Sequence, residues 1–233
     1  MDQTKVPIGK IGEYNIAQNV SSIIETGVLA LEKAISPMCM AEIKKNNEIE
    51  LKKIINVFIL ITFCCTFIFS LWCKEIFELL IKNDTLLKAY PIASLLVLAL
   101  NYRPLYIAAT NVYFYNMKTK DLLYITLIAG VISIIGNIIL IPLLGILGGA
   151  IITYIAYLYQ GYIGFFLKPF KEYSNISFPV FKLFALQNII TIIAMLNLNS
   201  SYMIKCTLTF CTFICILLYL VYDKKLRLII NFL

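Results

Sequence analysis

Residues 137–154 decide the fold class, because their sequence NIILIPLLGILGGAIITY places a Pro/Gly turn between two long uncharged runs. The stretch contains Pro142, Gly145 and Gly149. No water in the core of a lipid bilayer can pair with exposed amides, so each uncharged run must be a helix and the irregular turn must lie at or near an interface. The stretch therefore predicts a membrane hairpin in which Pro142, Gly145 and Gly149 serve as hinge or packing residues.

The composition independently favours a membrane protein. Hydrophobic residues make up 61% of the chain and the mean hydropathy is +0.85, whereas soluble domains have about 45–50% apolar residues. The chain has seven cysteines and no histidine. Six of the cysteines lie in or at the ends of apolar runs, where they are expected to pack as small apolar side chains: Cys64, Cys65, Cys73, Cys206, Cys211 and Cys215. We therefore expect no metal site and no cofactor.

The apolar segments have the length of membrane-spanning helices. Because roughly twenty apolar residues cross a bilayer, the sequence predicts an all-α, polytopic membrane helical bundle of about seven transmembrane helices. The predicted spans are residues 13–36, 54–73, 89–116, 121–141, 146–167, 178–197 and 202–222. The first span contains Glu25, Glu32 and Lys33, so the alternative is a helix that lies on the membrane surface and leaves six spans.

Lysine and arginine residues gather in alternate loops, and cytoplasmic loops are the ones that accumulate them. Twelve lie in one set of loops and six in the other. The set of twelve, expected to be cytoplasmic, consists of Lys44, Lys45, Lys52, Lys53, Lys118, Lys120, Lys168, Lys171, Lys182, Lys224, Lys225 and Arg227. This orientation puts the amino end outside and the carboxyl end inside. It also accounts for much of the net charge of +7, so we expect membrane lipids and no nucleic acid as partners.

The connection at residues 74–84 alternates charged and apolar residues at helical spacing. This pattern predicts an amphipathic helix on the outer interface. Asn83 and Asp84 are expected to end it.

Three segments in this order resemble a known family. They are Gly12-Glu-Tyr-Asn-Ile-Ala17 followed by a helix ending at Ser36-Pro37, the amphipathic segment up to Ala89-Tyr90, and the hairpin 141–150. Together they are similar to the carboxyl-terminal half of polysaccharide flippases. These are the O-antigen and capsule transporters of the MATE-like multidrug/oligosaccharidyl-lipid/polysaccharide superfamily.

The resemblance implies a two-bundle transporter in the bacterial inner membrane. Residues 1–170 would form its second helical bundle, and residues 171–233 an additional carboxyl-terminal helical hairpin and cytoplasmic tail. The implied activity is alternating-access movement of an undecaprenyl-pyrophosphate-linked oligosaccharide to the outer leaflet, for O-antigen, capsule or exopolysaccharide synthesis. The implied partners are this lipid-linked oligosaccharide and either an amino-terminal bundle or a second copy of the chain.

Arg103 is the principal candidate for binding substrate. It lies midway in a run that is otherwise uncharged from Ala89 to Met117, and even translocon-based scales assign a central arginine about 2.5–3.5 kcal/mol. Pro104 follows it, removes one backbone donor and is expected to kink the helix. A guanidinium presented there can bind a pyrophosphate through paired hydrogen bonds. The alternative is that Arg103 only pairs with Glu25 or Glu32 and stabilises the bundle.

The remaining candidates are acidic, aromatic and amide side chains. Glu25 and Glu32 are seven residues apart and share a helical face; either can take a proton after losing an arginine partner. Tyr106 and Asn111 are candidates for binding sugar, although tyrosine also favours membrane interfaces.

Two other functions are compatible with the pattern. One is a MATE-like multidrug exporter that binds cations at Glu25 and Glu32, against which a buried Arg103 argues. The other is a non-transporting membrane partner, or a fragment of a disrupted flippase gene. An enzyme is not expected, because the sequence has no histidine for acid/base work and no phosphate-binding glycine loop.

Overall fold

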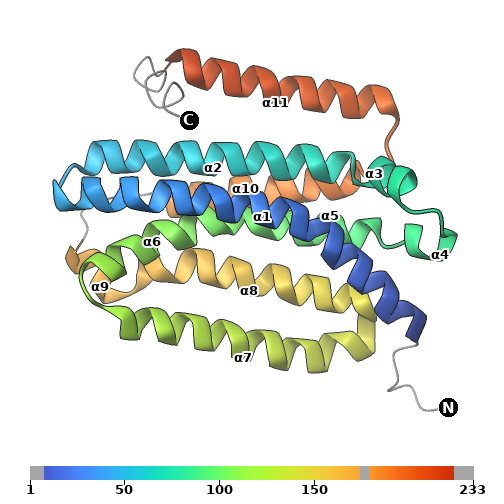
Figure 1. The fold of residues 1–233 in the computed structure, drawn as a ribbon, viewed down its shortest axis with the longest axis horizontal. Helices are drawn as coiled ribbons and strands as arrows, with labels where there is room; N and C mark the ends of the chain where they lie inside the picture. Colours follow the sequence, from blue (N-terminus) through green and yellow to red (C-terminus); the bar gives the residue numbers. More distant parts are fainter. Residues whose placement is uncertain (1–7, 174–178, 223–233) are drawn as a thin grey trace. The chain divides into compact units, whose positions relative to one another are not determined.

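The computed structural model describes residues 8–173 and 179–222, and every regular element among these residues is a helix (Figure 1). The chain divides into two compact units between Leu198 and Asn199. The helices of the first unit are α1 (Ile8–Lys44), α2 (Glu48–Leu71), α3 (Cys73–Leu80), α4 (Asp84–Leu87), α5 (Tyr90–Ala99), η1 (Leu100–Tyr102), α6 (Arg103–Tyr115), α7 (Thr119–Leu144), α8 (Ile146–Phe166), α9 (Lys168–Tyr173) and α10 (Val180–Leu196). The second unit contains α11 (Tyr202–Tyr222). The prediction of an all-helical fold is confirmed for the described residues. The predicted boundary between a helical bundle of residues 1–170 and a carboxyl-terminal hairpin and tail of residues 171–233 stays a prediction.

Helices α5, η1 and α6 form a nearly continuous, largely buried run through the middle of the first unit (Figure 1). Pro104 determines where this run is interrupted, because proline lacks an N–H and its ring collides with the carbonyl four residues earlier. The chain therefore tightens into a 3₁₀ turn at Leu100–Tyr102, where the Arg103 N–H bonds to the Leu100 carbonyl. Helix α6 then begins with Pro104 in its first turn. The interruption expected at Pro104 thus takes the form of a tightened turn.

Helices α7 and α8 form an antiparallel hairpin, which confirms that both flanks of the decisive stretch are helical (Figure 1). The turn is shorter than predicted. Gly145 alone reverses the chain, with φ 65° and ψ −147°, and a positive φ is cheap only for glycine. Pro142 instead lies inside α7, in its last turn, where it cannot donate to the carbonyl four residues earlier. The prediction that Pro142 forms part of the turn is wrong.

Helix α1 is longer than predicted and does not end at Ser36-Pro37. It continues through Pro37 to Lys44, although an interior proline costs a helix about 3 kcal/mol. The segment around Pro37 is held by burial, since Ile35 and Cys39 lie in one apolar core with Leu51 of α2. Packing against α2 and α6 thereby offsets the local cost of the proline.

The amphipathic helix predicted at residues 74–84 is shorter than expected, and a second short helix, α4, begins at Asp84. Helix α3 ends at Leu80, and it buries Cys73 and Phe77 while Leu79 is exposed. The Asn83 side chain accepts a hydrogen bond from the Thr85 N–H at 3.0 Å. Asn83 is therefore the N-cap residue of α4, a position that asparagine favours. The prediction that Asn83 ends the preceding helix is wrong, because α3 already ends at Leu80.

Among the described residues, four stretches are long and apolar enough to cross a membrane: Glu48–Leu71, Asp84–Tyr115, Thr119–Leu144 and Ile146–Phe166. They correspond to four of the predicted spans. Helix α1 is not among them, and α10 has only 17 residues. The fold is therefore a helical bundle compatible with membrane insertion, and its helix lengths and compositions do not establish seven spans.

Gly161 brings α8 directly against η1. A Cβ at this position would lie 2.9 Å from both the Cβ and the carbonyl oxygen of Tyr102. We expect Gly161→Ala to lower the free energy of unfolding by about 1–3 kcal/mol, because overpacking must displace backbone. Denaturation of the purified protein in detergent micelles measures this change.

Gly130→Ala in α7 is the matched control, because no atom lies within 4 Å of the added Cβ. The control is expected to gain up to about 1 kcal/mol from helix propensity. Equal stabilities of the two variants would contradict the close approach of α8 to η1.

Candidate functional site

Polar side chains gather around the 3₁₀ turn, where the apolar run is interrupted. Asn101 is almost completely buried, and its backbone carbonyl accepts a hydrogen bond from Gln187 Nε2 of α10 at 3.0 Å. Gln187 also accepts a hydrogen bond from the Tyr162 hydroxyl of α8. The Thr66 hydroxyl of α2 bonds to the Asn101 side chain at 2.5 Å. These contacts tie three helices to the backbone beside Pro104.

The neighbouring Tyr102 extends this polar layer toward α8 and α10. Its hydroxyl is in hydrogen-bond contact with that of Tyr154, and the two rings meet edge to face at 5.2 Å between centroids. The Tyr154 hydroxyl also lies 3.1 Å from Thr191 Oγ1 and 3.3 Å from Asn188 Oδ1. Buried hydroxyls normally have such partners, since an unpaired one costs free energy in an apolar medium.

Arg103 pairs with Glu32 of α1. Its Nε donates to Glu32 Oε2 at 3.1 Å, and each side chain keeps 22% of its surface exposed. The guanidinium carbon lies 5.9 Å from the centre of the Tyr106 ring, at the edge of the range for a cation–π contact. Among the described residues, Glu32 is the carboxylate that Arg103 binds, and this bond uses only one of the three guanidinium nitrogens.

Glu25 lies on the same side of α1 as Glu32 but has a different partner. The Tyr157 hydroxyl of α8 is 3.4 Å from Glu25 Oε1. Both residues line a cavity of about 70 Å³, together with Gln18, Ser21, Leu96, Leu100 and Thr153. The cavity is large enough for water, and its lining offers several polar partners.

The structure brings together some of the predicted site residues and separates others. Arg103, Glu32 and Tyr106 form one cluster, and Glu25 lies about two turns of α1 away. Asn111 is buried, and its Nδ2 has no hydrogen-bond partner among the described residues. Its proposed contact with sugar, like that of Tyr106, stays a prediction.

The sequence reasoning missed the tyrosines of α8 that complete the site. Tyr154, Tyr157 and Tyr162 each bond to a polar group of α1, η1 or α10. A signal was present, because residues three or four apart recur on one helical face. An aromatic stripe with hydroxyl groups inside a predicted span indicates polar partners on the facing helices.

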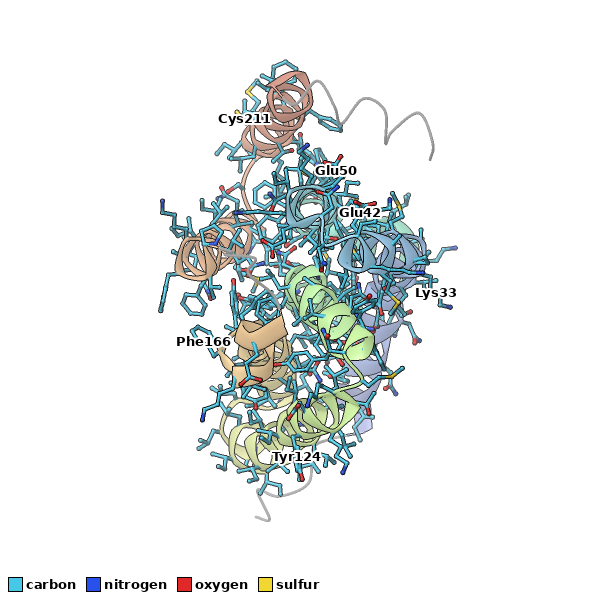
Figure 2. The ribbon with its side chains drawn as sticks, turned by 90° about the vertical axis from the view of Figure 1, so that its left-hand side faces the viewer. Lys33, Glu42, Glu50, Tyr124, Phe166 and Cys211 are labelled. Carbon is cyan, nitrogen blue, oxygen red and sulfur yellow. The ribbon has the colours of Figure 1, made fainter. Side chains whose placement is uncertain are left out.

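The outer faces of α1 and α7 differ sharply in chemistry. Along α7 nearly every exposed large side chain is apolar: Leu123, Tyr124, Leu127, Ile128, Val131, Ile134, Ile135, Ile138, Ile139, Leu143 and Leu144. Such a surface is suited to lipid and far too apolar for water. The exposed residues of the middle of α1 are mostly polar or small: Asn15, Gln18, Asn19, Ile23, Thr26, Gly27, Ala30, Lys33 and Ala34. Lys33 and Tyr124 mark the two outer faces in Figure 2.

The face of α1 lies at the depth of the candidate spans. Helix α1 packs along α2, α5 and α6, and Glu32 is level with Arg103 because the two bond directly. Lipid tails offer no hydrogen bonds to the amides of Gln18 and Asn19 or to the ammonium of Lys33. In a membrane this face requires water or protein beside it.

Comparison with protein-family models, with curated proteins and with solved structures found no match for the chain.

Removing one charge of the Arg103–Glu32 pair leaves the other without its partner. We expect Arg103→Gln to lower the free energy of unfolding on the order of 1–3 kcal/mol, with a matching fall in membrane abundance. A second change, Glu32→Gln, should restore much of the loss, because it removes the orphaned carboxylate. Denaturation of the single and double variants gives their coupling energy.

Glu25→Gln is the matched control for this cycle, since Glu25 lies one heptad away and bonds to Tyr157. It should not rescue Arg103→Gln. Rescue by Glu25→Gln but not by Glu32→Gln would contradict the observed pairing.

The contrast between the two outer faces predicts different reactivities of introduced cysteines. In a background lacking the seven native cysteines, Ala30→Cys on α1 should react with a charged maleimide about tenfold faster than Val131→Cys on α7, because only a hydrated thiol ionises readily. Labelling rates in membrane vesicles measure the difference. Equal protection of both positions would mean that protein or lipid covers the α1 face completely.

Proposed function

We propose that this chain is a component of a membrane transporter that flips an undecaprenyl-pyrophosphate-linked oligosaccharide across the bacterial inner membrane. The observation that carries the proposal is the partly exposed Arg103–Glu32 pair beside the polar outer face of α1. A helix that served only to anchor the protein would expose apolar residues to lipid, as α7 does. The polar face is suited to an aqueous path along the bundle.

The chemistry of Arg103 favours an anionic group on the transported molecule. Its bond to Glu32 uses Nε, so the two terminal nitrogens remain for paired hydrogen bonds to phosphate oxygens. A pyrophosphate arriving there competes with Glu32 for the guanidinium. Glu32 then faces the path without its partner and can take up a proton, which couples the step to a proton gradient.

Export of cationic drugs is the competing function, and Glu25 with its small polar cavity is the observation that favours it. Arg103 opposes it, because a fixed cation at the same depth repels a second one. The two functions differ in which substitution matters, so one experiment separates them.

The experiment uses the full chain reconstituted in vesicles with a fluorescent polyprenyl-pyrophosphate glycan. Protection of the fluorophore from a membrane-impermeant reductant measures the rate of flipping. We expect Arg103→Gln to slow it by about ten- to a hundredfold, the loss of a charge-assisted hydrogen-bonded pair. Arg103→Lys should be intermediate, because it keeps the charge but not the planar fork.

Lys120→Gln, at the exposed start of α7, is the matched control for lost charge and should flip at the unaltered rate. Efflux of a cationic dye that depends on Glu25 and not on Arg103 would favour the drug exporter. No flipping by the unaltered chain, alone or with an added amino-terminal bundle, would overturn the proposal.

A further inference from the structure

A second cavity, unconnected with Arg103, lies where α1 begins and the α7–α8 hairpin turns. It measures about 300 Å³ and is lined by Ile11, Tyr14, Asn137, Ile141, Ile146 and Gly149. Since a water molecule occupies roughly 30 Å³ of the liquid, the volume corresponds to about ten waters. Three of the lining side chains are isoleucines, so water is a poor occupant.

Gly149 keeps the cavity open. A Cβ at this position would point toward Tyr14 and Asn137, 3.5 Å from Tyr14 Cε2 and 3.7 Å from Asn137 Oδ1. Asn137 Oδ1 is itself buried and has no hydrogen-bond partner among the described residues. A polar acceptor inside an otherwise apolar cavity is costly unless an occupant donates to it.

The cavity lies at one end of two candidate spans, where a membrane changes from hydrocarbon to headgroups. Lys10 reaches the same place, since its ammonium lies 4.0 Å from where a Cβ on Gly145 would be. The first backbone amides of α8 lie at this end as well and add partial positive charge. The adjoining outer face of α7 is apolar, with Ile138 and Leu143 largely exposed.

We propose that this cavity binds one phosphate-bearing lipid. The hydrocarbon chain fills the space between Ile11, Ile141 and Ile146, and the phosphate lies against Lys10 at the turn. A hydroxyl of the headgroup or of the glycerol donates to Asn137. The hydrophobic effect does not favour moving a hydrocarbon chain from the bilayer into the cavity, because both surroundings are apolar. The preference of the lipid for the cavity comes from dispersion contacts there and from the attraction of Lys10 for phosphate.

The test reconstitutes the full chain in phosphatidylcholine vesicles containing phosphatidylglycerol with a photoreactive acyl chain. Mass spectrometry then locates the cross-links. We expect them to concentrate in residues 11–14 and 137–149. Cross-links spread along α7 at Leu127, Ile134 and Ile135 in proportion to their exposure would overturn the proposal.

Two pairs of variants sharpen this result. Gly149→Leu fills the cavity and should reduce cross-linking there by about tenfold, whereas Gly130→Leu, on the open face of α7, should not. Lys10→Gln should reduce it by about fivefold, whereas Lys120→Gln should not. Gly149→Ala is a milder variant that should fold normally, because its methyl group meets only ordinary contact distances. It should still weaken the cross-link.

Competition distinguishes the possible sources of the lipid. Displacement by unlabelled phosphatidylglycerol identifies a bulk phospholipid, and preferential displacement by polyprenyl phosphate identifies an isoprenoid lipid. Equal displacement by diacylglycerol, which carries no phosphate, would overturn recognition of phosphate. These readouts need no flipping, so they can fail independently of the proposed transport.

Discussion

The rest of the first unit depends on how the backbone is satisfied beside Pro104. In an apolar medium every amide and carbonyl must find a partner inside the protein, and a proline in the middle of a run disturbs this balance. Two features provide hydrogen bonds to the carbonyls before Pro104: the 3₁₀ turn itself, and Gln187, which donates to the Asn101 carbonyl. The turn also presses Tyr102 against Gly161. Helices α8 and α10 are therefore positioned by one local break in α5–α6.

That break also explains why a charge occurs where it does. Arg103 begins α6 immediately after the turn, so its side chain extends toward α1 and reaches Glu32. The same α1 exposes Asn19 and Lys33 beside the side that carries Glu32. A charged pair with polar groups in front of it is expensive in lipid and much cheaper beside water or a second bundle. The arrangement favours one specialised side of the unit, with α7 left to face lipid.

The sequence predicted the helices better than their ends. Long uncharged runs identified α2, α5–α6, α7 and α8 because hydropathy is a local property. The ends were less predictable: Pro37 lies inside α1, which packs against α2 and α6, and Pro142 lies in the last turn of α7. Arg103 was identified as a candidate, and Glu32 was one of two partners left open, since both acids share a helical face. The choice depends on the level at which α1 passes α6, which no local pattern encodes. Tyr157 was missed for the same reason.

The geometry of the Arg103–Glu32 pair bears on its function. A pair retained only for stability is best fully buried, and even then desolvation offsets much of the attraction between its charges. This pair is instead partly exposed on both sides and joined through one nitrogen. Its net contribution to stability is therefore modest, while the cost of keeping two charges in an apolar bundle persists. A guanidinium held loosely, with donors to spare, is better suited to exchanging Glu32 for an anionic ligand than to locking two helices together.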